Sequence, residues 1–281
     1  MIERNPLRTF FRHVVLVTGV FIVMFPVYIA FVASTHDLAS ITQAPMPIRP
    51  GLLFFSNYVQ AIFEGSKNLG SAVGVMMKNS FIMAMGISIG KIVISLLAAF
   101  ALVFFKFPGQ SFFFWSVFIT LMLPIEVRIM PSYKVISDLG MLNSYVGLIL
   151  PMMVSATGVF LFRQFFKTIP REIVEAAQMD GSSPMRFFLQ ILVPMTKTSI
   201  AAMFVIQFLY GWNQYLWPLL ITTEEKYYTL LIGINRMLAV GDQQAEWQII
   251  MATTILAMLP PVLVVISMQK LFVKGMTETE K

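Results

Sequence analysis

Three ionisable side chains lie within apolar segments that are long enough to cross a bilayer: Lys91, Glu126 and Arg128. A charge near the bilayer midplane costs about 3 kcal/mol on insertion scales, so each of them needs a physical reason for its place. Lys91 is expected to face the interior of a helix bundle or to extend toward the membrane surface. A role in packing, or in contact with another chain, is favoured for Lys91 over substrate contact.

Glu126 and Arg128 lie near the end of their segment, between Pro124 and Pro131. Prolines loosen a helix and free backbone carbonyls, so a cavity could open here. Residues two apart on a regular helix point about 200° apart, so these two side chains are not expected to pair with each other. Both are candidates for a substrate path. The alternatives are a pair with a neighbouring chain for Glu126 and anchoring at the interface for Arg128.

A second group of polar and aromatic side chains follows Gly211 in another apolar segment, in the run WNQY at 212–215. Amide and indole groups suit the recognition of hydroxyls, which makes Trp212 and Asn213 further path candidates. Asn213 is the stronger of the two. Amides also link helices to one another in membranes, so a structural role remains open.

Catalysis by a nucleophile and base has no support in the sequence. The only histidines, His13 and His36, are separated by a helix length of roughly 30 Å, and the chain has no cysteine. Neither a phosphate-binding loop of the G-x-x-x-x-G-K-[ST] type nor a cluster of metal-ligating residues is present. We expect no catalytic residue, no metal and no cofactor. If the chain takes part in ATP-driven transport, another subunit must bind the ATP.

The most informative segment is 175–194, which reads EAAQMDGSSPMRFFLQILVP. The residues 175–177 favour helix, and the Asp-Gly pair at 180–181 ends it. One of the serines at 182–183 can cap a second helix with Pro184 in its first turn. The pattern predicts a helix, a sharp turn and another helix. Its plainest interpretation is an amphipathic hairpin between two membrane spans.

Composition places these residues in an integral membrane protein. Hydrophobic residues make up 57% of the chain, charged residues 12%, and the mean hydropathy is +0.77. We expect an all-α fold of one transmembrane domain over residues 1–281, with a loop at about 163–197. About 20 apolar residues are needed for each span. The six expected spans are about 14–34, 79–105, 112–129, 145–162, 198–221 and 247–269.

Basic residues orient the expected spans, because cytoplasmic connections carry an excess of Lys and Arg. One side of the alternating connections holds Arg4, Arg8, Arg12, Lys106, Arg163, Lys167, Arg171, Arg186, Lys197, Lys270, Lys274 and Lys281. The other side holds Arg49, Lys67, Lys78, Lys134, Lys226 and Arg236. Both termini and the loop at 163–197 are therefore expected in the cytoplasm. The first span is too long for a secretory signal and is expected to be retained.

Two connections on the outer side carry local signals. The stretch 36–78 is rich in Pro, Gly and Asn, and an ordered cap with short helices around 57–63 and a passive connector are both open readings. The run DLGMLNS at 138–144 predicts a turn.

The motifs together resemble one family. The EAA loop, the run MLPIEVRIMPSYKVISDLGMLNSYVGLILP at 122–151 and the run YGWNQYLWPLL at 210–220 are similar to those of carbohydrate-type ABC importer permeases. The resemblance covers nearly the whole chain. It implies the type I, MetI-like permease fold with six transmembrane helices in the bacterial inner membrane. It also implies a second, different permease, two ATPase subunits and a periplasmic binding protein as partners, and the lipid bilayer as surroundings, with no nucleic acid.

The resemblance also assigns a role to the loop. Its helices would sit in a groove of one ATPase subunit and carry that subunit's motion into the bundle. The residues of the family pattern present here are Glu175, Ala176, Ala177, Asp180, Gly181 and Pro194. A solvated helix carboxylate is the alternative account of Glu175.

Within the family, the runs ITLMLPIEVRIMP, FLFRQFF, DGSSPMRFF and YGWNQYLWPLL are most similar to permeases of the glycerol-3-phosphate group. This implies sn-glycerol-3-phosphate or related glycerophosphodiesters as the substrate. Arg128 would then bind the phosphate through its planar, bidentate guanidinium.

The sequence also has features in common with other classes of protein. A permease for maltose, another sugar or an oligosaccharide shares most of these motifs. An autonomous channel or secondary transporter would use Lys91, Glu126 and Arg128 as a relay, but it has no need of a cytoplasmic docking hairpin. A membrane enzyme is disfavoured by the missing catalytic cluster.

Overall fold

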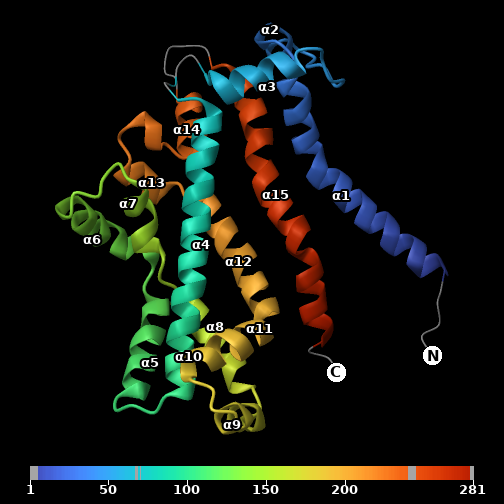
Figure 1. Ribbon diagram of the computed structural model, residues 1–281. Helices are drawn as coiled ribbons and strands as arrows, with labels where there is room; N and C mark the ends of the chain where they lie inside the picture. Colours follow the sequence, from blue (N-terminus) through green and yellow to red (C-terminus); the bar gives the residue numbers. More distant parts are fainter. Residues whose placement is uncertain (1–5, 67–68, 70, 240–244, 279–281) are drawn as a thin grey trace. The chain divides into compact units, whose positions relative to one another are not determined.

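A computed structural model describes residues 6–66, 69, 71–239 and 245–278, and every regular element within them is a helix (Figure 1). Arg4, Lys67 and Lys281, which contribute to the charge asymmetry, lie outside the described residues, as does the side chain of Glu126. The elements run in the order α1 Pro6–Ser34, α2 Leu38–Thr42, α3 Phe54–Phe63, α4 Val73–Phe104, α5 Gln110–Ile119, η1 Thr120–Met122, α6 Ile125–Asp138, α7 Tyr145–Ile149, η2 Leu150–Met152, α8 Ala156–Lys167, α9 Arg171–Met179, α10 Pro184–Phe187, η3 Phe188–Leu192, α11 Val193–Met195, α12 Lys197–Trp212, α13 Leu216–Ile221, η4 Glu225–Tyr227, α14 Leu230–Leu238 and α15 Trp247–Glu278.

Three of the described helices are long and apolar enough to cross a membrane, in the ranges Leu7–Ser34, Val73–Phe104 and Trp247–Gln269. Two bent pairs of helices would raise the number to five if each pair is one span. The pairs are Tyr145–Met152 with Ala156–Lys167, bent by 49°, and Pro184–Met195 with Lys197–Trp212, bent by 75°. The fold is that of a multi-span membrane protein, while the predicted number of six spans is not reached by these described helices.

The expected third span, 112–129, is not one helix. Helix α5 ends at Ile119, a 3-10 turn follows, and Leu123 and Pro124 are extended before α6 begins at Ile125. Pro124 has ψ 145°, and as a proline it has no N–H to continue the helical ladder. Hydropathy alone did not show this break, because the segment stays apolar across it.

Packing divides the chain into two compact units, residues 1–76 with 233–259 and residues 77–232 with 260–281. The boundaries fall within the continuous helices α4, α14 and α15. The prediction of one permease domain over 1–281 stays a prediction.

In the first unit, hydrogen bonds order the connection after α1. Asn57 of α3 donates through Nδ2 to the carbonyls of Ser34 and His36, both at 2.9 Å. Gly51 N–H donates to Thr35 Oγ1 at 2.7 Å, and Ser34 Oγ lies 3.0 Å from the Tyr58 hydroxyl. The ordered cap with short helices is therefore confirmed over the passive connector.

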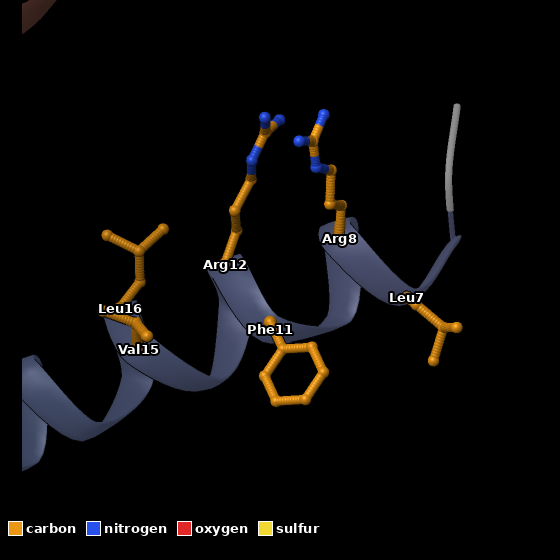
Figure 2. A pocket seen from close by; sticks show the side chains of 6 residues that line it. All are labelled: Leu7, Arg8, Phe11, Arg12, Val15 and Leu16. Carbon is orange, nitrogen blue, oxygen red and sulfur yellow. The ribbon is translucent and has the colours of Figure 1, made fainter. Parts of the chain in front are cut away.

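The side chains of α1 from Leu7 to Phe25 are exposed. Figure 2 shows a hollow beside its first turns, with Arg8 and Arg12 on one side of the helix and Phe11 on the other. All the side chains that line it come from α1. The hollow therefore has one wall and is the surface of a helix rather than an enclosed site.

The second unit holds two apolar cores. One joins α4, α8, α9, α10, η3 and α12 through the buried residues Ile92, Leu96, Ala99, Phe100, Phe162, Phe166, Ala177, Phe187, Phe188, Leu192 and Met203. The other joins α4, α6, α7, η2 and α13 through Met83, Ile87, Ile136, Leu148, Met152, Trp217 and Ile221. The first core sits where α8, α9 and α10 gather at one end of α4 (Figure 1).

Candidate functional site

Helix α9 ends at a turn that the Asp180–Gly181 pair was predicted to form. Asp180 is the C-cap, and Gly181 takes φ +68° in the left-handed region, which glycine enters without steric cost. Gly181 N–H donates to Gln178 O at 3.0 Å and Ser182 N–H donates to Ala177 O at 2.9 Å. This pair of bonds is a Schellman motif, which satisfies carbonyls that the last turn would leave unpaired. The predicted helix stop is confirmed.

The next helix starts where the serine and proline signals place it. Ser183 is the N-cap, and its hydroxyl accepts a bond from Arg186 N–H at 3.3 Å. Pro184 occupies the first turn, where its missing N–H leaves no intrahelical bond unmade. Of the two serines, Ser183 is therefore the cap.

Pro194 lies in the continuous helical segment formed by α10, η3 and α11, and part of this segment is π-helical. A proline cannot donate to the carbonyl four residues before it, and its ring crowds that carbonyl. The residues just before it, Phe188–Leu192, form a π-helical turn, which is the usual form of such a local insertion. The buried side chains of this segment, Phe187, Phe188 and Leu192, all belong to the apolar core. The loop is thus fixed to the bundle by its second helix as well as by α9.

The three residues of the EAA motif divide between two environments. Ala177 is 6% exposed and lies in the core with Phe100 and Phe187, while Ile173 and Val174 pack beside it. Glu175 and Ala176 are exposed. Helix α9 is therefore amphipathic: the face with Ala177 packs into the core, and the face with Glu175 and Ala176 is exposed.

A second feature is a cavity of about 120 Å³ that brings two cations together. Lys91 of α4 and Arg128 of α6 both line it. Its other lining residues are Ile129, Ser132, Pro151, Met152, Val154, Tyr210 and Trp217.

Lys91 is buried, at 7% exposure, and is held in place by groups of α12. Its Nζ donates to Gln207 Oε1 at 2.8 Å and lies 3.7 Å from the centroid of the Tyr210 ring. An amide oxygen and an aromatic face both stabilise an ammonium group away from water without neutralising it. Of the two orientations predicted for Lys91, the one that faces the bundle interior is confirmed.

Arg128 is exposed at the cavity and forms no ion pair with the carboxylates that the structure describes. Ser132 lies one turn further along α6 and adds a hydroxyl to the same lining. The cavity thus combines two cationic donors with hydroxyl groups, an arrangement suited to an anion.

The sequence of this chain matches a known protein family. Residues 91–278 match the family described as binding-protein-dependent transport system inner membrane component. The chain belongs to this family. Among relatives, the sn-glycerol-3-phosphate transport system permease protein UgpE of Brucella melitensis is 53% identical, and that of Rhizobium meliloti 51%, with the whole of each chain covered. UgpE of Salmonella typhi is also 51% identical over the full length of both chains.

A solved structure shares the fold. A chain of a bacterial ABC transporter that imports the acidic polysaccharide alginate aligns with a TM-score of 0.82, covering 96% of this chain and 98% of that one. The sequence identity is 18%, so this likeness speaks for the fold alone. It confirms the ABC importer permease fold predicted from the motifs.

The permease brings only part of the predicted path residues together. Arg128 lines the cavity, and Glu126 is in the first turn of α6, with its side chain outside the described part. Trp212 is 5% exposed and stacks on Phe208 with ring centroids 5.9 Å apart. Asn213 is an exposed C-cap of α12. Neither of the last two lines the cavity of Arg128.

The sequence did not predict that Lys91 and Gln207 would belong to this site. Lys91 was expected to pack, and the structure adds that it lines the cavity. Gln207, its partner, lies 116 residues away along the chain, so no local pattern pointed to it. An amide in the middle of an apolar span was the one available signal.

Proposed function

We propose that this chain is one of two different permease subunits of an ATP-driven importer that moves sn-glycerol-3-phosphate or related glycerophosphodiesters across the bacterial inner membrane. The observation that carries the proposal is the full-length likeness, at 53% identity, to a permease named for sn-glycerol-3-phosphate transport. Two ATPase subunits, the second permease and a periplasmic binding protein complete the proposed assembly. Both termini and the loop at 163–197 face the cytoplasm in this proposal, as the positive-inside distribution favours.

The chain forms part of the translocation pathway for the substrate, and the partner subunits hydrolyse the ATP. The exposed face of α9, with Glu175 and Ala176, is the surface proposed to meet an ATPase subunit. Ala177 on the opposite face belongs to a core shared with α4, α8 and α12. A displacement of α9 would therefore reach the spans through packed side chains, because close-packed interiors transmit strain. Asp180 and Gly181 form the turn between the two loop helices, and Pro194 lies at the far end of the second one.

Arg128 and Lys91 are proposed to receive the phosphate group on its way through the permease. Moving a phosphate ester into a low-dielectric path removes its hydration, and a guanidinium offsets part of that loss by a bidentate bond. Two cations in one cavity repel each other, and an anion between them lowers that repulsion. Binding must remain modest, because release becomes slow if it is tight. A single cavity with two cations fits this requirement better than a long basic lining.

The experiment is uptake of glycerol-3-phosphate into vesicles that contain the complete transporter with Arg128→Gln. We expect slower uptake at unchanged recovery of ATPase subunits, because the loop is untouched. Lys134→Gln is the matched control, since Lys134 lies on the same helix, is exposed and pairs with Asp138 outside the cavity. Unchanged uptake in Arg128→Gln at full complex yield would contradict the phosphate role, and loss of assembly would assign Arg128 to structure instead.

A further inference from the structure

A groove of about 830 Å³ in the second unit reaches Glu175 of α9, but its basic lining has no role in the function proposed above. Its walls come from the end of α4, the start of α5, the end of α8 and one side of α9. Four basic side chains line it against a single carboxylate, that of Glu175: Lys106, Arg163, Lys167 and Arg171. A lining of this charge favours an anion.

Arg163 is the best-placed of the four cations. Its guanidinium carbon lies 3.8 Å from the centroid of the Phe114 ring, so the cation lies over an aromatic face. Its Nε atom is buried and has no hydrogen-bond partner among the described residues. A buried donor without a partner costs free energy, so the chain does not satisfy this guanidinium, and the part of Arg163 that lines the groove is left to bind a phosphate oxygen. The planar guanidinium is suited to phosphate in particular, because it binds two oxygens at once.

The groove opens beside a helix suited to lipid. Helix α5 reads QSFFFWSVFI and carries no charge. Phe112, Trp115 and Ile119 are 70%, 56% and 60% exposed. Tryptophan is enriched at the level of lipid headgroups, and Lys106 precedes the helix. Acyl chains along α5 would therefore leave a headgroup at the mouth of the groove.

We infer that the groove binds the phosphodiester headgroup of an anionic phospholipid of the cytoplasmic leaflet, with Arg163 as its central ligand. Lys106, Lys167 and Arg171 supply the surrounding positive charge. Basic pockets between transmembrane helices on the cytoplasmic side are suited to such lipids. The inference rests on the proposed orientation in the membrane. It links bilayer composition to α9, since Val174 and Glu175 also line the groove.

The test is native mass spectrometry of the purified complete transporter, delipidated and then titrated with phosphatidylglycerol or with phosphatidylcholine. We expect preferential retention of phosphatidylglycerol, and about tenfold weaker retention in Arg163→Gln, the size of losing one hydrogen bond to a charged group. Arg186→Gln is the matched control: Arg186 is exposed on the same loop, bonds Gln190 and lies outside the groove. Arg163→Lys keeps the charge but loses the planar fork, so intermediate retention is expected.

Other occupants give other results. Displacement of the lipid by millimolar inorganic phosphate would show a site for free phosphate and overturn the lipid assignment. Lipid retention only after the ATPase subunits are removed would show that the groove seats protein, and it would overturn the inference too. Equal retention in Arg163→Gln and Arg186→Gln would also refute it. The readout does not use transport, so failure here leaves the proposed function standing, and failure of uptake leaves this inference standing.

Discussion

Gly181→Val should open the turn between α9 and α10 without disturbing the spans. A Cβ at position 181 meets no atom within 4 Å, so the substitution causes no clash, and its cost comes from the backbone alone. At φ +68°, an L residue other than glycine pays about 1–2 kcal/mol, and a β-branched residue is the least tolerated. That penalty lowers the equilibrium constant for the formed turn by roughly 5- to 30-fold.

Hydrogen exchange reports this opening directly, because the amides of Gly181 and Ser182 donate to Gln178 O and Ala177 O. We expect their protection to fall by about the same 5- to 30-fold, with little change in the core amides of α4. The transporter should then lose ATPase subunits or substrate-stimulated hydrolysis. Gly181→Asn is the control, since asparagine enters the left-handed region readily. The asparagine variant should keep the protection and the stimulated hydrolysis of the wild type. A valine variant that also keeps both would refute the argument.

Three further predictions concern packing and orientation. Ala177→Leu should lower the thermal midpoint of the permease purified without its ATPase subunits, because the larger side chain overfills the core at a cost of about 1–3 kcal/mol. Ala176→Leu on the exposed face should leave that midpoint unchanged, and equal midpoints would contradict the division of α9. Gly211→Ala should also lower the midpoint, because its Cβ would lie 2.9 Å from Ala84 Cα in α4, while Gly19→Ala, with nothing within 4 Å, serves as control. Cysteines introduced at Gln43 and Glu225 should react with an impermeant thiol reagent in spheroplasts and one at Ser182 should not, and labelling of the last would reverse the proposed orientation.

The loop could be predicted in detail from sequence because its signals are local. The glycine at 181, the serine cap at 183 and the proline at 184 each fix one backbone feature within a few residues, and all three features are present. The break at Pro124 was within reach of the same reasoning, since proline ends a helix wherever the ladder needs its N–H. The hydropathy of the segment does not show the break, because the residues on both sides of Pro124 are apolar.

The cavity depends on contacts that no local pattern carries. Lys91 and Gln207 come together only through the packing of α4 against α12, where Gly211 allows a close approach to Ala84. The sequence indicated that Lys91 would avoid lipid, because an exposed charge there is costly. It did not indicate that Lys91 and Arg128 would share a cavity. Trp212, chosen from the sequence for its polar neighbours, is buried and stacks on Phe208, and its place on the substrate path stays a prediction.

The central claim is that this permease moves a phosphate ester at the expense of ATP. Its most direct test is uptake of labelled sn-glycerol-3-phosphate and of maltose, in parallel, into vesicles holding this chain with its partner permease, ATPase subunits and binding protein. The account predicts uptake of glycerol-3-phosphate that requires both ATP and this chain, with little uptake of maltose. Import of maltose without glycerol-3-phosphate, or uptake of glycerol-3-phosphate that continues without ATP, would contradict it.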